Sequence, residues 1–550
     1  MSAIEITVLR KADGLPLTKR ISLGPDGSLR SDGSACVMSR GIAWRFRFSR
    51  IEQLAELIER FGPDQAIALG GLRPDLPDRV EVVTKRKLNG TTDPNVIARS
   101  RDYIIYRPGE FALALVDYDT KGMPPSVKRR LGELGGLWPA LVSVIPELAA
   151  VARVVRKSTS AGLSRIDTGE KLSGSGGEHV FLVVEDGEDI ERLLKTLHLR
   201  CWLAGLGWLM VGVGGQLLER SIVDRVVGSP ERLVFEGAPV LDHPLAQDQA
   251  SRRPVVTAGG ALDSVAVCPP LTILEQSRLR ELRAKETARL QLEADRARKA
   301  FIAEQAAPLV ELTGIASNLA LRVIERQCAG ILLPDVVLPF DDEDLAGATV
   351  ADVLADPDRF QDATLADPLE GVGYGAGKAK IMRRSDGTIW IHSFAHGRTV
   401  YELKFDYKAA KTVLEKAPVD ELAALFVRLV LTADINPAEV EQLRNLVHGR
   451  AGIGKRPLDV MLKKARERQA AAEATAARER QFTERQDPRP FIPVPPPDAE
   501  WLPQMNTINE VLGKCLAIVP PLRDADRMCA QDRTITVPSL SSLSKEEANR

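Results

Sequence analysis

The sequence predicts an α+β protein with several domains, and three features of the 550-residue chain support this prediction. Strand-like and helical segments alternate over residues 1–265. A long, charged, alanine-rich helix follows, and short strands return after it. The next part is helical in pattern and ends at a proline-rich stretch. At roughly 100–200 residues per domain, the chain has room for about three to five domains.

These changes of pattern divide the chain into five segments. They are a large mixed part (1–265), a helical spacer or hairpin arm (271–330), a small α/β domain (331–408), a helical domain (409–485), and a proline-rich linker with a C-terminal tail (486–550). The long helix is expected to act as a spacer because its apolar stripe is thin and Glu281 and Lys285 form a favourable surface pair. Within the first part, residues 103–119 are expected to contain an apolar strand.

Composition excludes several classes of protein. The chain has 74 Lys+Arg and 75 Asp+Glu, so it is not expected to coat nucleic acid by bulk charge, although local basic patches remain possible. The six cysteines form no CxxC pair, which argues against a zinc ribbon or a disulfide framework. The first residues have no apolar signal core, and no run of eighteen apolar residues occurs. We therefore expect a cytoplasmic protein with no membrane partner.

Two aspartates end the predicted apolar strand. Asp117 and Asp119 are two residues apart, so on a strand their side chains face the same side. Two carboxylates placed in this way are suited to bind a pair of Mg²⁺ or Mn²⁺ ions. A capped turn before Thr120 is the alternative, and the pair alone does not decide between the two.

A glycine-rich loop, Ser173–His179, follows the aspartates and runs into another apolar strand. Glycine lets backbone N–H groups approach an anion closely, and His179 is placed to donate to a triphosphate oxygen. Upstream, Ser158 and Ser160 supply hydroxyls for the same phosphates. For the loop alone, an ordinary hairpin with an ordinary histidine is the alternative.

A single aspartate comes third. Asp224 is a candidate to complete the carboxylate set, and an ion pair with a neighbouring arginine is its alternative role. Arg232 follows as a candidate contact to the template or the nucleotide.

In this order, the Asp117/Asp119 pair, the loop Ser175–His179 and Asp224 resemble the motifs of the archaeo-eukaryotic primase superfamily, in particular the primase–polymerases of mobile elements and prophages. The resemblance covers about residues 1–265. It implies an N-terminal α/β unit and an RRM-like unit with the active site between them. It also implies that the three aspartates bind metal and that His179 contacts the incoming nucleotide. From their positions beside these motifs, Ser158, Ser160, Gly177 and Arg232 are our further candidates for binding the nucleotide.

The resemblance implies an enzyme that uses Mg²⁺ or Mn²⁺ to synthesise primers from nucleoside triphosphates on single-stranded DNA, for replication of a mobile element, plasmid or phage. Two alternatives stay open. One is a catalytically idle DNA-binding protein that loads a helicase, and the other is a metal-dependent nuclease that uses the same carboxylates.

Two basic segments are candidates for DNA contacts. In the run Trp44–Phe48, aromatic and basic residues alternate, so Arg45 and Arg47 share one face of a strand. That face is suited to follow template phosphates, and a core strand with a solvated basic face is the alternative. The second segment is Lys85, Arg86 and Lys87, for which a solvated surface is the alternative.

The remaining segments bear on the partners. Residues 367–380 and 391–397 look like a segment that lies between primase and helicase in phage and element proteins, and a buried structural turn is the alternative. Residues 449–455 have the spacing of a Walker A loop, but Arg456 replaces the hydroxyl that binds Mg²⁺ and the preceding residues are helical in pattern. We therefore expect a small all-α domain here and a helicase on a separate polypeptide.

Overall fold

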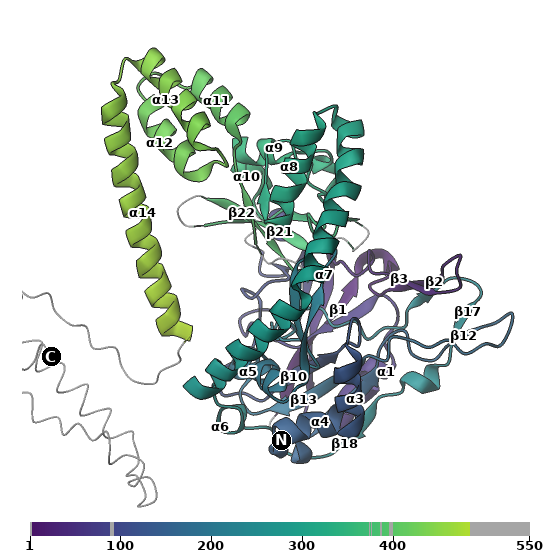
Figure 1. The fold of residues 1–550 in the computed structure, drawn as a ribbon. Coiled ribbons are helices and arrows are strands. Elements are labelled where there is room, and N and C mark those ends of the chain that lie inside the picture. The colour runs from purple at the N-terminus through teal and green to yellow at the C-terminus, as the bar shows by residue number, and fades with distance from the viewer. Residues whose placement is uncertain are drawn as a thin grey trace, which may run out of the picture. The chain divides into compact units, whose positions relative to one another are not determined.

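The computed structural model describes residues 3–88, 93–372, 375, 377–384, 388–394 and 400–484 (Figure 1). The chain divides into two compact units, Met1–Leu458 and Asp459–Arg550. Mixed helices and strands confirm the α+β class. His396 and the proline-rich segment from residue 486 lie outside the described residues.

The first sheet contains five strands in the order β5-β1-β4-β7-β8. Its strands are β1 (Ile4–Lys11), β4 (Arg40–Phe48), β5 (Gln65–Ala68), β7 (Arg79–Val83) and β8 (Val96–Ala98). All neighbours are antiparallel except β7 and β8. The helix α1 (Ile51–Glu59) buries Ile51, Leu54, Ala55 and Ile58, the spacing of one helical face, so it packs with that face on the core.

The second sheet carries the motif residues and has the order β10-β13-β11-β18. Its strands are β10 (Ala112–Tyr118), β11 (Arg153–Lys157), β13 (Glu178–Val184) and β18 (Val255–Thr257). Since β13 is antiparallel to both β10 and β11, those two strands are parallel, with the later strand β13 inserted between them. The helices α3 (Pro125–Glu133) and α4 (Leu137–Val144) connect β10 to β11, and α5 (Ile190–Leu203) follows β13. This is a split β-α-β arrangement.

The two sheets share one hydrophobic core. It joins Ile4 and Ile6 of β1 to Leu113 of β10, Phe181 of β13 and Leu193 of α5. The strand β10 is buried at every position except Asp117, as expected of a continuous apolar run covered on both faces. The apolar strand predicted within residues 103–119 is present as β10, and Ile104–Ile105 form a separate short strand, β9, which pairs with β6 (Gly71–Leu72).

The long charged helix is present as α7 (Ile273–Thr313), which pairs with α8 (Ser317–Cys328). A capping box between Thr272 and Glu275 begins α7, and left-handed Gly314 ends it. Its first half is more than a spacer, since Leu279 and Leu290 are buried against Trp202 of α5. The thin apolar stripe is therefore sufficient to attach α7 to the core (Figure 1).

A second five-stranded sheet lies in the segment 331–408, which we call the downstream module. Its strands, in the order β19-β23-β22-β21-β20, are β19 (Ile331–Leu332), β20 (Thr364–Leu365), β21 (Ala379–Arg383), β22 (Ile389–Ser393) and β23 (Val400–Leu403). The helices α9 (Val350–Ala355) and α10 (Pro357–Phe360) cover its own core.

The helical part consists of α11 (Tyr407–Lys416), α12 (Leu422–Thr432), α13 (Pro437–Ala451) and α14 (Lys455–Glu484). The Walker-like residues form the end of α13, a turn at left-handed Gly452, and the start of α14. Because a helix and not a buried strand precedes the turn, the expectation against a P-loop is confirmed. Over the described residues, no helix has the length and apolar character needed to cross a lipid bilayer.

The remaining elements are small. The strands are β2 (Arg20–Leu23), β3 (Leu29–Asp32), β12 (Leu163–Arg165), β14 (Gly207–Val211), β15 (Leu217–Ser221), β16 (Val240–Leu241) and β17 (Leu245–Gln247). The helices are α2 (Lys85–Leu88) and α6 (Ser264–Val267), with 3₁₀ turns at Ala12–Gly14, Pro146–Ala150, Gly187–Asp189, Gln249–Arg252 and Glu343–Leu345. Of these, the antiparallel hairpin β14–β15 lies closest in sequence to Asp224.

Candidate active site

The first aspartate lies at the end of β10 and the second lies just beyond it. Asp117 pairs in register with His179 of β13. Asp119 is exposed and begins a turn, because its Oδ1 accepts a hydrogen bond of 2.9 Å from the Lys121 amide. The turn uses Oδ1 of Asp119. Because a carboxylate has two oxygens, Asp119 can cap the turn and also bind a metal ion.

Asp224 is brought to Asp117 although 107 positions separate them in the sequence. The Asp224 amide donates to the Asp117 carbonyl at 3.3 Å, so the two backbones lie side by side. The Asp224 Oδ1 accepts from the Val226 amide at 2.9 Å, which fixes the carboxylate in a local turn. The structure therefore places the third predicted aspartate beside the first.

The charges of these aspartates act on one another. Burial raises the pKa of Asp117, and the Asp224 and Asp119 carboxylates raise it further, against the opposing effects of His179 and Arg232. Like charges near a partly buried carboxylate disfavour its ionised form. The surroundings of Asp117 are therefore favourable for a cation.

His179 lies between the carboxylates and a buried ion pair. Its Nε2 is 3.6 Å from Asp117 Oδ1, and its Nδ1 is 2.5 Å from Glu236 Oε1. The Glu236 side chain is 1% exposed and also binds Arg156 Nη1 at 3.2 Å. Burial alone would lower the pKa of His179, but Glu236, by its charge and hydrogen bond, and Asp117 outweigh burial and raise it. The imidazole is thus held by Nδ1, with Nε2 directed to the carboxylates.

The glycine-rich loop packs on the turn that carries Asp119. A Cβ on Gly177 would stand 2.8 Å from the Tyr118 carbonyl, so only glycine fits this approach. The hydroxyls of Ser158, Ser160 and Ser175 lie 3.0–3.1 Å from one another. Predicted Ser158 and Ser160 therefore form one hydroxyl cluster with the loop.

Two cationic side chains, Arg232 and Lys19, act on the charges of Asp117 and His179. Arg232 is close enough to oppose the rise in the pKa of Asp117, and its Nη1 donates to the Val226 carbonyl at 3.0 Å. Lys19 belongs to none of the predicted motifs, and its positive charge lowers the pKa of His179. Positive charge thus approaches the carboxylates from Arg232 and from the segment before β2.

Arg45, predicted as a DNA contact, has its side chain engaged within the protein. Its side chain is 4% exposed, and its five N–H groups face Glu5, Asp78 and backbone carbonyls of residues 72, 73 and 76. With all donors engaged inside the protein, Arg45 is a structural bridge. Strand alternation predicted the face of the strand on which Arg45 lies, but not that this side chain is buried there.

The other basic candidates are accessible. Arg47 is 57% exposed although it also binds Glu5 at 2.7 Å. Lys85 and Lys87 are exposed on α2, and Arg86 forms an ion pair with Asp342 of the downstream module. These four residues remain candidate DNA contacts.

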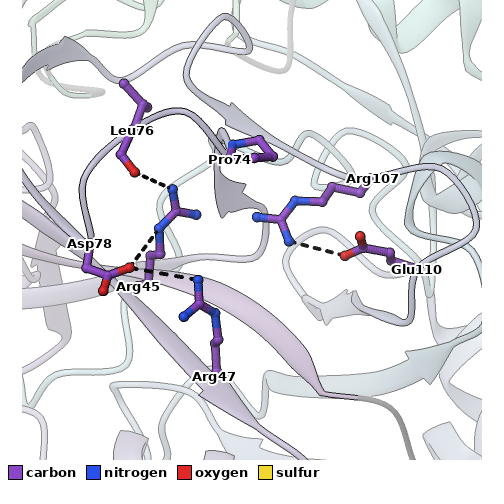
Figure 2. A pocket seen from close by; sticks show the side chains of 7 residues that line it. All are labelled: Arg45, Arg47, Pro74, Leu76, Asp78, Arg107 and Glu110. Atoms are coloured by element: carbon purple, nitrogen blue, oxygen red, sulfur yellow. Dashed lines mark hydrogen bonds and ion pairs between the residues drawn. The ribbon is translucent and has the colours of Figure 1, made fainter. Parts of the chain in front are cut away.

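A pocket of about 320 Å³ lies beside β4, and none of the predicted aspartates lines it. Figure 2 shows its lining, which is Arg45, Arg47, Pro74, Leu76, Asp78, Arg107 and Glu110. The dashed lines show that Asp78 and Glu110 engage the arginines, and Glu5 also pairs with each of the three.

Two site residues, Glu236 and Arg156, were not found from the sequence. Each is a charged residue in a row of alternating buried positions, after Val234 and Val154 respectively. The sequence held one signal for them: each charged residue stands where the two-residue period of a strand predicts a buried apolar residue.

The donor set fits a hard divalent cation, since carboxylate oxygens are the ligands that Mg²⁺ and Mn²⁺ prefer. In the part of the chain that the structure describes, however, no three His, Cys, Asp or Glu side chains converge closely enough to hold one ion. The aspartates therefore gather around Asp117 without forming a closed cage.

A comparison with models of protein families gives no match, and comparisons with curated proteins and with solved structures give none either. The interpretation of the site therefore depends on the motifs and the geometry described above.

Proposed function

We propose that this chain is a primase–polymerase that joins nucleotides on a single-stranded DNA template. The observation that carries the proposal is the meeting of three separate motifs at one sheet end. Asp117 lies opposite His179 at 3.6 Å, and the Asp224 amide bonds to the Asp117 carbonyl at 3.3 Å. A shared site explains why motifs that are separate in the sequence lie in contact in the fold.

The topology also supports the proposal. The parallel strands β10 and β11 with β13 between them, joined by helices, have the order of the first three strands of an RRM-like unit. The first sheet supplies an N-terminal unit that shares its core. This agrees with the two-unit catalytic core of the primase resemblance.

In the proposed reaction, the oxygen of a primer 3′-hydroxyl attacks the α-phosphorus of a nucleoside triphosphate. The new P–O bond replaces the bond between the α-phosphorus and the oxygen of the β-phosphate, pyrophosphate leaves, and the hydroxyl proton passes to water. Asp117, Asp119 and Asp224 are the residues that would hold divalent cations, and such cations would lower the pKa of the hydroxyl and stabilise the leaving group.

The protein's own groups bind and orient the triphosphate. Glu236 Oε1 accepts a hydrogen bond from the Nδ1–H of His179 and fixes the ring, so the Nε2–H, beside Asp117, can donate to a phosphate oxygen. The cluster of Ser158 and Ser160 supplies hydroxyl donors, and Arg232 supplies a positive charge.

The proposal is tested by synthesis of labelled products on single-stranded DNA with Mg²⁺ or Mn²⁺. Wild type makes short products, and Asp117→Ala/Asp119→Ala makes none above background, because the metal ligands are gone. Glu52→Ala/Glu56→Ala, on the exposed face of α1, removes the same charge and retains synthesis.

Full synthesis by the aspartate double variant would falsify the site assignment. Loss of labelled DNA without nucleotide addition in wild type indicates a nuclease instead. DNA binding without any incorporation indicates a replication protein that has no catalytic activity.

A further inference from the structure

The sheet of the downstream module has a face that packs on the core of the module and an outer face. Along β22, Ile389 and Ile391 are buried and alternate with Trp390 and His392, which are only partly buried. The two isoleucines belong to the core that includes side chains of α8, α9 and α10, and neither Trp390 nor His392 is among the described side chains of that core. Because side chains alternate across a strand, both rings lie on the outer face.

Phe394 extends this row of rings just past the end of β22. Its amide donates to the Lys378 carbonyl at 2.7 Å, which continues the pairing of β22 with β21. The ring centroids of Trp390 and His392 are 5.5 Å apart, and those of His392 and Phe394 are 4.8 Å apart. Three rings, which we call the aromatic row, thus follow one another along the outer face.

The exposure of Phe394 is unusual in this chain. Its side chain is 54% exposed, and among the large apolar side chains that are exposed in the described residues it is the only aromatic one. It lies next to a ring on its own face and outside the core of the module. A ring presented to solvent at the end of a row of rings is suited to bind a flat partner.

Cationic side chains accompany the aromatic row. The Arg384 guanidinium lies over the Trp390 ring, 5.9 Å from its centroid, and Lys380 stands opposite the middle ring of the row on β21. The carboxylates beside them, Asp362 and Glu402, are each paired with a lysine, at 2.5 and 2.9 Å. Rings bordered by guanidinium and ammonium groups are typical of surfaces on which the bases of a single strand stack.

The Phe394 end of the row lies where the downstream module meets the first part of the chain. Gly377 precedes the residue that pairs with Phe394, and its amide donates to both oxygens of Asp341 at 3.0 and 3.1 Å. A Cβ on Gly377 would stand 3.4 Å from Val37 Cγ2, in the loop between β3 and β4. The aromatic row therefore runs toward the part of the chain that carries the aspartates.

The basic helix α2 is joined to the same end of the module. Asp342, the neighbour of Asp341, forms an ion pair with Arg86 of α2. The flanking residues Lys85 and Lys87 are exposed. Two ammonium groups that can contact phosphates are thus tied to the segment that holds the Phe394 end of the row.

We propose that the aromatic row binds single-stranded DNA by stacking on its bases, and that Lys85 and Lys87 bind phosphates of the same strand. A single strand is favoured over a protein partner because cations border the rings, and over a duplex because the bases of a duplex are already stacked on one another. The identity of this strand as the template rests on the proposed function, whereas the binding itself does not require nucleotide addition.

The test is fluorescence anisotropy of a labelled oligothymidylate with the full chain, without nucleotides or divalent cations. We expect Phe394→Ala to weaken binding by about 5-fold or more, the usual loss for one stacked base. Phe394→Trp retains the affinity because it keeps a ring, and Phe394→Leu loses as much as Phe394→Ala. The control is Val337→Ala, an apolar side chain of the same module that is 49% exposed, and it retains wild-type affinity.

The salt dependence of binding separates stacking from phosphate contacts. Lys85→Ala/Lys87→Ala should reduce the slope of log affinity against log salt concentration by about 0.7 for each lysine, since each phosphate contact releases counterions. Phe394→Ala should leave that slope unchanged, because a stacked base releases none. An unchanged slope in the lysine double variant overturns the assignment of α2 to this strand.

Four further results decide the inference. Wild-type affinity in Phe394→Ala, with the wild-type unfolding midpoint, overturns it. Wild-type affinity in Phe394→Leu indicates a general apolar contact, as in a surface that docks a protein, and also overturns it. Tighter binding of an RNA strand of the same length overturns the assignment to DNA. Weaker binding by Phe394→Ala in a protein whose wild type makes no product supports the aromatic row while the proposed reaction fails.

Discussion

Glu236 is the residue on which the geometry of His179 depends. Its carboxylate is 1% exposed and lies between His179 and Arg156. Burial would raise the pKa of Glu236, but the charge and hydrogen bond of His179 and the charge of Arg156 lower it, so the group is ionised and paired. Removing one partner of a buried pair leaves the other charge without compensation.

We therefore expect Glu236→Gln to lower the free energy of unfolding by about 3 kcal/mol, because buried Arg156 loses its counter-charge. Urea unfolding at neutral pH measures the change. The matched control is Glu185→Gln, an exposed carboxylate just after the same strand β13, which should change stability by less than about 0.5 kcal/mol. Equal stabilities of the two variants would show that the buried pair is not a major stabilising interaction.

At the scale of elements, α7 supports the segment that positions Asp224. Arg283 of α7 donates from Nε to Glu219 Oε1 at 2.9 Å, and Glu219 lies 3.3 Å from His198 Nε2. The His198 Nδ1 contacts the Ser221 hydroxyl at 2.9 Å, and that hydroxyl accepts from the Val223 amide at 3.1 Å. A chain of hydrogen bonds thus connects the helix to the residue before Asp224.

The pH dependence of stability tests this connection. Burial alone would raise the pKa of Glu219, but hydrogen bonds from His198 and Arg283 and the charges of Arg283 and Arg225 lower it to about 2. Because the pKa is lower in the folded chain than the usual 4.5, the stabilisation is complete above about pH 4.5 and is lost as the pH falls toward 2. The Glu219→Gln variant should therefore be less stable than wild type by roughly 2–3 kcal/mol at about pH 6.

That difference should shrink below about 1 kcal/mol near pH 2.5, as urea unfolding at a series of pH values would show. Glu286→Gln is the control, since Glu286 lies on α7, the helix that carries Arg283, and pairs with Arg289 at the surface at 2.8 Å. It should change stability by less than about 1 kcal/mol at every pH. A difference between Glu219→Gln and wild type that stays constant with pH would contradict the depressed pKa.

At the scale of the whole molecule, local pattern predicted the elements better than their contacts. The apolar run before Asp117 and the helix from residue 273 follow from composition and period. The contact between Asp224 and Asp117 joins segments far apart in sequence, and periodicity carries no information about such pairs. The burial of the Arg45 side chain was not predicted either, because an alternating pattern does not say which side chains on a strand are covered.

The predicted domain boundary after residue 265 can be tested by shortening the chain. Although the motifs end before it, Leu279 and Leu290 of α7 cover Trp202 and Leu209. A chain that ends at Pro270 exposes these side chains and loses the burial of both leucines, at about 1.5–3 kcal/mol for each.

We expect the chain ending at Pro270 to unfold at a clearly lower urea concentration than a chain ending at Gln469, followed by tryptophan fluorescence. The longer chain keeps α7, the downstream module and buried Leu462, so it should match the full-length protein in stability and in synthesis. Equal midpoints for the two shortened chains would mean that residues 1–270 fold independently of α7.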